Sequence, residues 1–129
     1  MLAANPYIQY QQNAVNSAEP GQLTLMLYNG AIKFTKQAIG ELKAGDIEKA
    51  NHYNIRVQDI ITELMITLNQ DYQLAQNLHS LYDYIKRRLI EANIKKDEKL
   101  LAEVLGMLEE LRNTWAEALK KVKTRVAEG

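Results

Sequence analysis

The residues that could carry chemistry in this 129-residue chain are two histidines and a set of carboxylates. Helical proteins commonly hold a pair of metal ions with two glutamates and two Glu-x-x-His motifs. Three residues before His52 stands Lys49, and three residues before His79 stands Gln76, so neither histidine completes that motif. Glu48 and His52 share one face of a helix, but two side chains do not make a metal site. The sequence therefore predicts no metal ion and no cofactor.

Covalent and acid–base catalysis have no better support. The chain has no cysteine, which removes thiol nucleophiles, zinc–thiolate sites and disulfides. The two serines, Ser17 and Ser80, make no credible catalytic constellation with two histidines. Glu109 and Glu110 are adjacent, so on a helix their side chains point about 100° apart and cannot work as a pair. We therefore expect a protein that is not an enzyme.

Charge and hydropathy argue against two further classes of partner. Sixteen Lys and Arg balance sixteen Asp and Glu, which gives a formal net charge of zero. A nucleic-acid binder would normally carry an excess of basic residues. No apolar run approaches the ~20 residues of a membrane-spanning helix, and no signal peptide is visible. The sequence predicts no nucleic-acid partner and no membrane insertion.

The elements that must position these side chains are helices. Proline is absent from Gly21 onward, so nothing there forbids a helix. Apolar residues recur at spacings of three and four in blocks at about 20–43, 46–69, 72–95 and 97–126. Asp46 and Asp97 stand where helix N-caps are expected, and Gly45 suits a helix end. Because the connections are short, we predict an all-α fold, an antiparallel up-down-up-down four-helix bundle over 20–129.

The first nineteen residues differ from the bundle in composition. The stretch from Asn5 to Asn13 is rich in Asn, Gln and Tyr and has no charged residue. We interpret residues 1–19 as an N-terminal arm or short capping helix, ordered only where its aromatic side chains find a surface. Tyr7, Ile8 and Tyr10 are large side chains of the kind that anchor interfaces. They pack either on the bundle's own end or on a partner.

The second and third blocks carry more apolar residues than a bundle core can use. On a helical wheel, successive residues are rotated by about 100°. In both blocks this places a second apolar stripe on the side of the helix away from the core stripe. Such a patch indicates a binding surface. The predicted binding groove is lined by Ile55, Thr62, Ile66, Tyr84, Ile90 and Ile94. Three occupants fit it: the chain's own arm, a second copy of the chain, or an amphipathic helix of another protein.

Several segments are similar to a known family. The stretches Asn5–Val15 and Pro20–Gly30 together strongly resemble the start of the flagellar secretion chaperones that bind flagellin. Leu81-Tyr82-Asp83-Tyr84, followed by Arg87-Arg88-Leu89, resembles that family's third-helix signature. Trp115 stands where the family has an aromatic residue in its last helix. The resemblance extends over nearly the whole chain.

This resemblance implies a cytoplasmic bacterial protein without catalytic activity. It implies binding of the C-terminal segment of newly made flagellin, which prevents premature polymerisation. It also implies delivery to the export gate protein of the flagellar type III secretion apparatus. In the family, residues of the N-terminal arm help to contact the gate, and Tyr7 and Tyr10 stand at the matching positions. The residues leave one alternative open, a self-associating structural bundle without a client, which would bury the same stripes in a homodimer.

Overall fold

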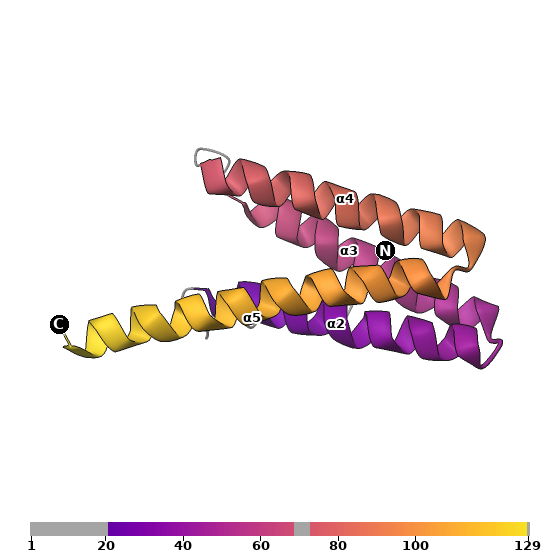
Figure 1. Cartoon of the computed structure of the whole chain (residues 1–129), viewed down its shortest axis with the longest axis horizontal. Coiled ribbons are helices and arrows are strands. Elements are labelled where there is room, and N and C mark those ends of the chain that lie inside the picture. The colour runs from indigo at the N-terminus through magenta and orange to yellow at the C-terminus, as the bar shows by residue number, and fades with distance from the viewer. Residues whose placement is uncertain (1–20, 69–72, 129) are drawn as a thin grey trace, which may run out of the picture.

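The chain forms a bundle of α-helices in a computed structural model that describes residues 21–68 and 73–128, and the side chains of residues 21–68 and 75–122. The helices are α2 (Gln22–Lys43), α3 (Ile47–Thr67), α4 (Gln73–Lys95) and α5 (Glu98–Glu128). Each of α2 and α4 packs against both α3 and α5, so antiparallel neighbours form a ring (Figure 1). The prediction of an all-α four-helix bundle is confirmed. The predicted arm over 1–19 lies outside the described residues.

Both turns at one end of the bundle use the same backbone motif. Gly45 (φ 82°) adopts the left-handed conformation after the C-cap Ala44 of α2, and Lys96 (φ 54°) does so directly after α4. The N–H groups of Asp46 and Asp97 then donate back to the last turn of the preceding helix, over 2.9 and 3.1 Å, as in a Schellman motif. Asp46 also caps α3, because its carboxylate accepts the N–H of Lys49 at 3.0 Å. We call this end, which contains residues 44–46 and 96–97, the turn end.

The helix boundaries differ from the predicted blocks by one or two residues. The first block was predicted to begin at about 20, whereas α2 begins at Gln22. The reason is Gly21, whose φ of 88° cannot continue a right-handed helix. The second block was predicted to reach 69, whereas α3 ends at Thr67, because Leu68 is extended. Local backbone conformation, which apolar spacing does not report, sets both ends.

The fully buried core runs along the inside of the bundle, from Leu27 and Leu64, near the start of α2 and the end of α3, to Ala38 and Leu101, nearer the turn end. In the half of this core nearer the start of α2, the hydroxyls of Tyr28 on α2 and Tyr82 on α4 are hydrogen-bonded to each other. Burial raises the pKa of both phenols, so both stay neutral and one donates to the other. The largest apolar side chains around this pair are Leu27, Val57, Ile61, Leu64, Ile85, Leu89, Leu101, Val104 and Leu108.

At the opposite end the helices separate into two pairs. Figure 1 shows α3 and α4 diverging from α2 and α5 toward the start of α2 and the end of α3. We call this the fork end. Apolar side chains at this end pack against the core but remain partly exposed, and they come from all four helices: Leu23, Met65, Leu68, Leu78, Leu81, Leu111 and Trp115. Partly exposed apolar side chains also lie near the turn end, among them Ile39, Leu42 and Leu100, so what distinguishes the fork end is the separation of the helix pairs.

Candidate interaction surface

Polar side chains hold α3 and α4 in register. Hydrogen bonds join Asn51 to Asn93, Asn54 to the Leu89 carbonyl at 3.1 Å, and Thr62 to Lys86 at 2.8 Å. Because these pairs run antiparallel along the two helices, Ile55 on α3 lies across from Ile90 on α4. Ile94 follows Ile90 one turn later on the same helix. The register therefore brings isoleucines of two helices together on the outside of the bundle.

These isoleucines are exposed to solvent. The exposed fraction is 44% for Ile55, 40% for Ile90, 71% for Ile66 and 76% for Ile94. All four belong to the predicted groove. We call Ile55, Ile90 and Ile94 the outer-face patch. Ile66 lies along α3 from Ile55 by about 16 Å at 1.5 Å per residue, toward the fork end.

Thr62 and Tyr84, the other two predicted groove residues, have different surroundings. The Thr62 hydroxyl donates to the Gln58 carbonyl at 3.0 Å and accepts from Lys86, so it helps to join α3 to α4. Tyr84 faces α5, where its hydroxyl donates to Glu103 at 2.7 Å. The structure therefore places Thr62 beside the isoleucines along α3 and Tyr84 on a separate seam between α4 and α5.

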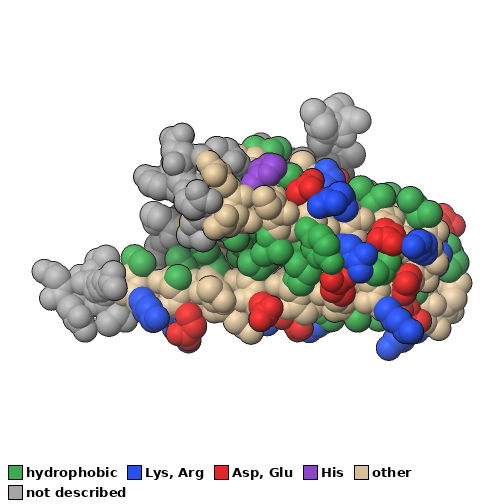
Figure 2. Space-filling view, turned by 45° about the horizontal axis from the view of Figure 1, so that its top comes forward, with side chains coloured by type: hydrophobic (Ala, Val, Ile, Leu, Met, Phe, Trp, Pro, Cys, Tyr) green, Lys and Arg blue, Asp and Glu red, His purple; other side chains and the backbone are tan. Residues whose placement is uncertain are grey.

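The seam between α4 and α5 changes character along its length. Near the turn end, Glu103 accepts hydrogen bonds from Tyr84 and from Arg88, the latter at 2.9 Å. The bond from Tyr84, and then that from Arg88, hold the pKa of the Glu103 carboxyl below its ordinary 4.5. Arg88 and Lys95 both also pair with Glu91. Figure 2 shows charged side chains over this part of the molecule and hydrophobic ones further toward the fork end.

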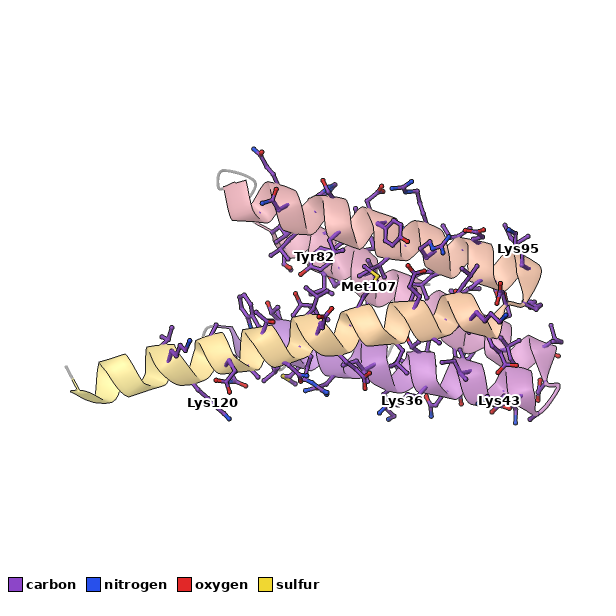
Figure 3. All side chains as sticks on the ribbon, viewed as in Figure 1. Lys36, Lys43, Tyr82, Lys95, Met107 and Lys120 are labelled. Atoms are coloured by element: carbon purple, nitrogen blue, oxygen red, sulfur yellow. The ribbon has the colours of Figure 1, made fainter. Side chains whose placement is uncertain are left out.

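The fork-end side chains belong to the apolar stripes that helical spacing puts on the inward faces of their helices. Leu78, Leu81, Leu111 and Trp115 do lie on the inward stripes, yet they stay partly exposed because the helix pairs diverge there. Figure 3 shows Met107 between α4 and α5 on the way to this end. Apolar spacing gives no signal for this exposure, because it does not report how far apart the facing helices lie.

The start of α3 carries an open hollow of about 580 Å³. Its lining is Asp46, Glu48, Lys49, Asn51, His52, Tyr53 and Ile55. Glu48 and His52 both reach it, but no group of three or more His, Asp or Glu side chains is arranged to hold a metal ion within the described part of the chain. The hollow is therefore a mixed polar and apolar surface that borders the outer-face patch at Ile55.

None of the helices that the structure describes is long and apolar enough to span a membrane. The apolar side chains on their surfaces are arranged as stripes and patches on otherwise polar helices. What such patches offer is a surface for another polypeptide.

Comparison with known proteins gives a consistent result. The model of the family described as "Flagellar protein FliS" matches residues 3–122. The flagellar secretion chaperone FliS of Bacillus subtilis is 47% identical over 120 residues, covering 93% of this chain and 90% of that protein. FliS of Salmonella typhimurium is 34% identical, covering 85% and 84%. A crystal structure described as a flagellar chaperone from bacteria has the same fold, with a TM-score of 0.75 at 21% identity over 90% of this chain and 96% of its own.

Proposed function

This chain belongs to the FliS family of flagellar secretion chaperones, and we propose that it binds the C-terminal segment of newly made flagellin, prevents premature polymerisation and delivers flagellin to the flagellar type III export gate. The general chaperone role, without enzyme activity, follows from the family. The client segment, the gate and a location in the bacterial cytoplasm are our proposals.

The observation that carries the proposal is the set of exposed isoleucines on α3 and α4. Single exposed apolar residues are common on proteins and need no explanation. Here Ile55, Ile90 and Ile94 gather on one face across two helices, and Ile66 extends the apolar surface along α3. A contiguous apolar patch with a polar rim is typical of a protein-binding site. Its shape along two helices favours the apolar face of an amphipathic partner helix.

A second apolar surface supports a client that wraps around the bundle. A segment that is disordered when free must lose conformational entropy on binding, so it needs a large interface. The outer-face patch and the partly exposed side chains of the fork end lie on different parts of the bundle. A client helix on each, joined by a linker passing Ile66, would supply that interface. We propose this path for the flagellin C-terminal segment.

The arm residues Tyr7, Ile8 and Tyr10 are our candidates for the gate contact. We further propose that the arm covers one apolar surface when flagellin is absent and leaves it when flagellin binds. Amide hydrogen exchange over residues 7–15 tests this. Exchange should change when a flagellin C-terminal peptide is added, and equal exchange with and without the peptide would contradict the displacement.

Calorimetric titration with a flagellin C-terminal peptide, followed by size-exclusion light scattering, tests the client assignment. We expect a one-to-one complex and a large negative heat-capacity change, because apolar surface is buried as the peptide folds. The client-free protein is measured in the same way. A stable homodimer that gives no heat with the peptide would contradict the proposal and favour a self-associating bundle that buries the same isoleucines.

A further inference from the structure

One cation lies within the row of exposed isoleucines on α3 and α4. Lys86 on α4 donates from Nζ to the Thr62 hydroxyl on α3 at 2.8 Å, and its side chain is partly buried. Ile66 lies one helical turn beyond Thr62 on α3, toward the fork end. Ile90 lies one turn beyond Lys86 on α4, toward the turn end. The ammonium group is therefore placed between Ile66 and the outer-face patch.

Within the part of the chain that the structure describes, Lys86 has no carboxylate partner. Its hydrogen bond goes to a neutral hydroxyl of α3. Asp83, which precedes Lys86 by nearly one turn on α4, pairs instead with Arg87 at 3.0 Å. Asp59 and Glu63 of α3 form no ion pair with Lys86 either. The row of isoleucines thus contains a positive charge that the described residues do not neutralise.

A client that covers the isoleucines must also cover this cation. The path proposed above runs from the outer-face patch past Ile66, so it crosses Lys86. A polypeptide on that path removes water from the ammonium group, and a charge that is buried without a partner is strongly unfavourable. A carboxylate of the client at that point replaces the lost water with a charge-assisted hydrogen bond. The cation therefore discriminates among amphipathic segments.

We propose that Lys86 is a specificity-determining residue of the client site and pairs with an aspartate or glutamate of the client. On a client helix that lies along the outer-face patch, the acidic residue stands about one helical turn, ~6 Å, beyond the residue that contacts Ile90. The pair also sets the direction of the client, because a helix laid the opposite way places its acidic residue elsewhere. This inference rests on the proposed function, in which the client is the C-terminal segment of flagellin.

Lys86→Met tests this in the full chain, because methionine keeps a long apolar side chain and removes the charge. Calorimetry measures affinity for a flagellin C-terminal peptide, and for versions of that peptide in which one acidic residue at a time becomes its amide. We expect Lys86→Met to bind the unchanged peptide about tenfold more weakly. At one acidic position the amide should cost about tenfold on the wild-type chain and little on Lys86→Met, since both changes remove the same pair.

Two control variants separate the pair from other effects of the substitution. Lys36→Met removes the charge of an exposed lysine on α2, diagonally across the bundle from α4 (Figure 3), and should leave affinity unchanged. Asn51→Ala removes another hydrogen bond between α3 and α4, so any affinity that it loses should be the same for every peptide. Thermal unfolding checks that all three variants fold.

The outcomes distinguish this inference from the proposed function. Unchanged affinity in Lys86→Met overturns the inference. So does a loss that is equal for every peptide, because a lysine that only holds α3 to α4 gives that result. If no acidic position of the peptide matters on the wild-type chain, the inference fails whatever the variant does. Failure of the wild-type chain to bind the unchanged peptide contradicts the proposed function itself.

Discussion

The turn end and the fork end of this bundle are built from the same four helices, but only at the fork end do the two helix pairs separate (Figure 1). At the turn end, two left-handed residues reverse the chain, Asp46 caps α3, and Asn51 and Asn54 bond α3 to α4. At the fork end, all four helices contribute apolar side chains that remain partly exposed.

This difference separates stability from binding. Fully buried apolar side chains contribute most to the free energy of folding, because all their surface leaves water. Partly exposed ones contribute less but can still bury surface against a partner. The polar bonds between α3 and α4 fix the register that gathers the outer-face patch, so the ordered end also positions exposed isoleucines. One part of the bundle holds the fold while other surfaces stay available to a client.

The largest expected effect comes from truncating one leucine of α4 near each end. Leu89→Ala removes a fully buried side chain and should lower the free energy of unfolding by about 3 kcal/mol. Leu78→Ala removes a partly exposed one and should cost about 1 kcal/mol. Urea unfolding followed by circular dichroism measures both. Equal losses would mean that the fork end is as well packed as the rest of the core.

A charge placed on the outer surface should affect binding and leave the fold intact. Ile66→Asp and Ile94→Asp should each weaken binding of the flagellin C-terminal peptide about tenfold, since each puts a carboxylate on an apolar contact. Ile47→Asp is the matched control, because Ile47 is also exposed, at 46%, but lies outside the predicted groove. Calorimetry gives the affinities and thermal unfolding checks the fold. If Ile66→Asp and Ile94→Asp bind as tightly as Ile47→Asp, the groove is misplaced.

The charged part of the α4–α5 seam predicts a smaller, pH-dependent effect. The pKa of Glu103 is lowered in the folded protein, so its ionised form adds stability above pH 4.5 that is lost as the pH falls through the folded pKa. Glu103→Gln should therefore have a lower free energy of unfolding than the wild type near neutral pH. In acid the difference between the two free energies should be smaller. Urea unfolding at about pH 7 and about pH 3 measures this, with Glu110→Gln as control. If the difference in free energy of unfolding between Glu103→Gln and wild type stayed constant with pH, the stabilising role of ionised Glu103 would be refuted.

The smallest effect concerns the two turns themselves. Lys96 adopts a left-handed conformation that suits glycine better, as Gly45 shows at the equivalent place after α2. Lys96→Gly should raise the free energy of unfolding by about 0.5 kcal/mol. Glycine relieves the backbone strain of the folded state, and its greater conformational entropy in the unfolded chain offsets part of that gain. The Lys96 side chain also donates to Asn93 at 2.8 Å, so Lys96→Ala serves to separate that contact. If the Lys96→Gly variant were less stable than the Lys96→Ala variant, the claim that the backbone at Lys96 is strained would be contradicted.

Much of the fold could be predicted because helix spacing, caps and turn residues are local properties. Asp46 needs only the N–H of Lys49, three residues on, and Gly45 needs only its own backbone. The helix count and the antiparallel order follow from such signals. The exposed isoleucines could also be identified, because a stripe opposite the core stripe is a property of one helix.

The remainder depended on contacts between distant residues. Helical spacing could not show that Tyr84 turns toward Glu103, nor that Trp115 bonds to Gly21 across 94 residues. It also puts Leu78 on the inward stripe of α4, although an inward stripe does not reveal whether the opposing helix is near enough to cover it. The divergence at the fork end is a property of four helices together.

The most direct test of the account is methyl NMR of the isoleucines during titration with a flagellin C-terminal peptide. The chain offers exposed isoleucines inside and outside the proposed surface and fully buried ones as internal references. We predict that the methyl resonances of Ile55, Ile66, Ile90 and Ile94 shift strongly, while that of Ile47 shifts little. Binding that shifts Ile47 and leaves those four unchanged would contradict the central claim that the exposed isoleucines of α3 and α4 receive the client.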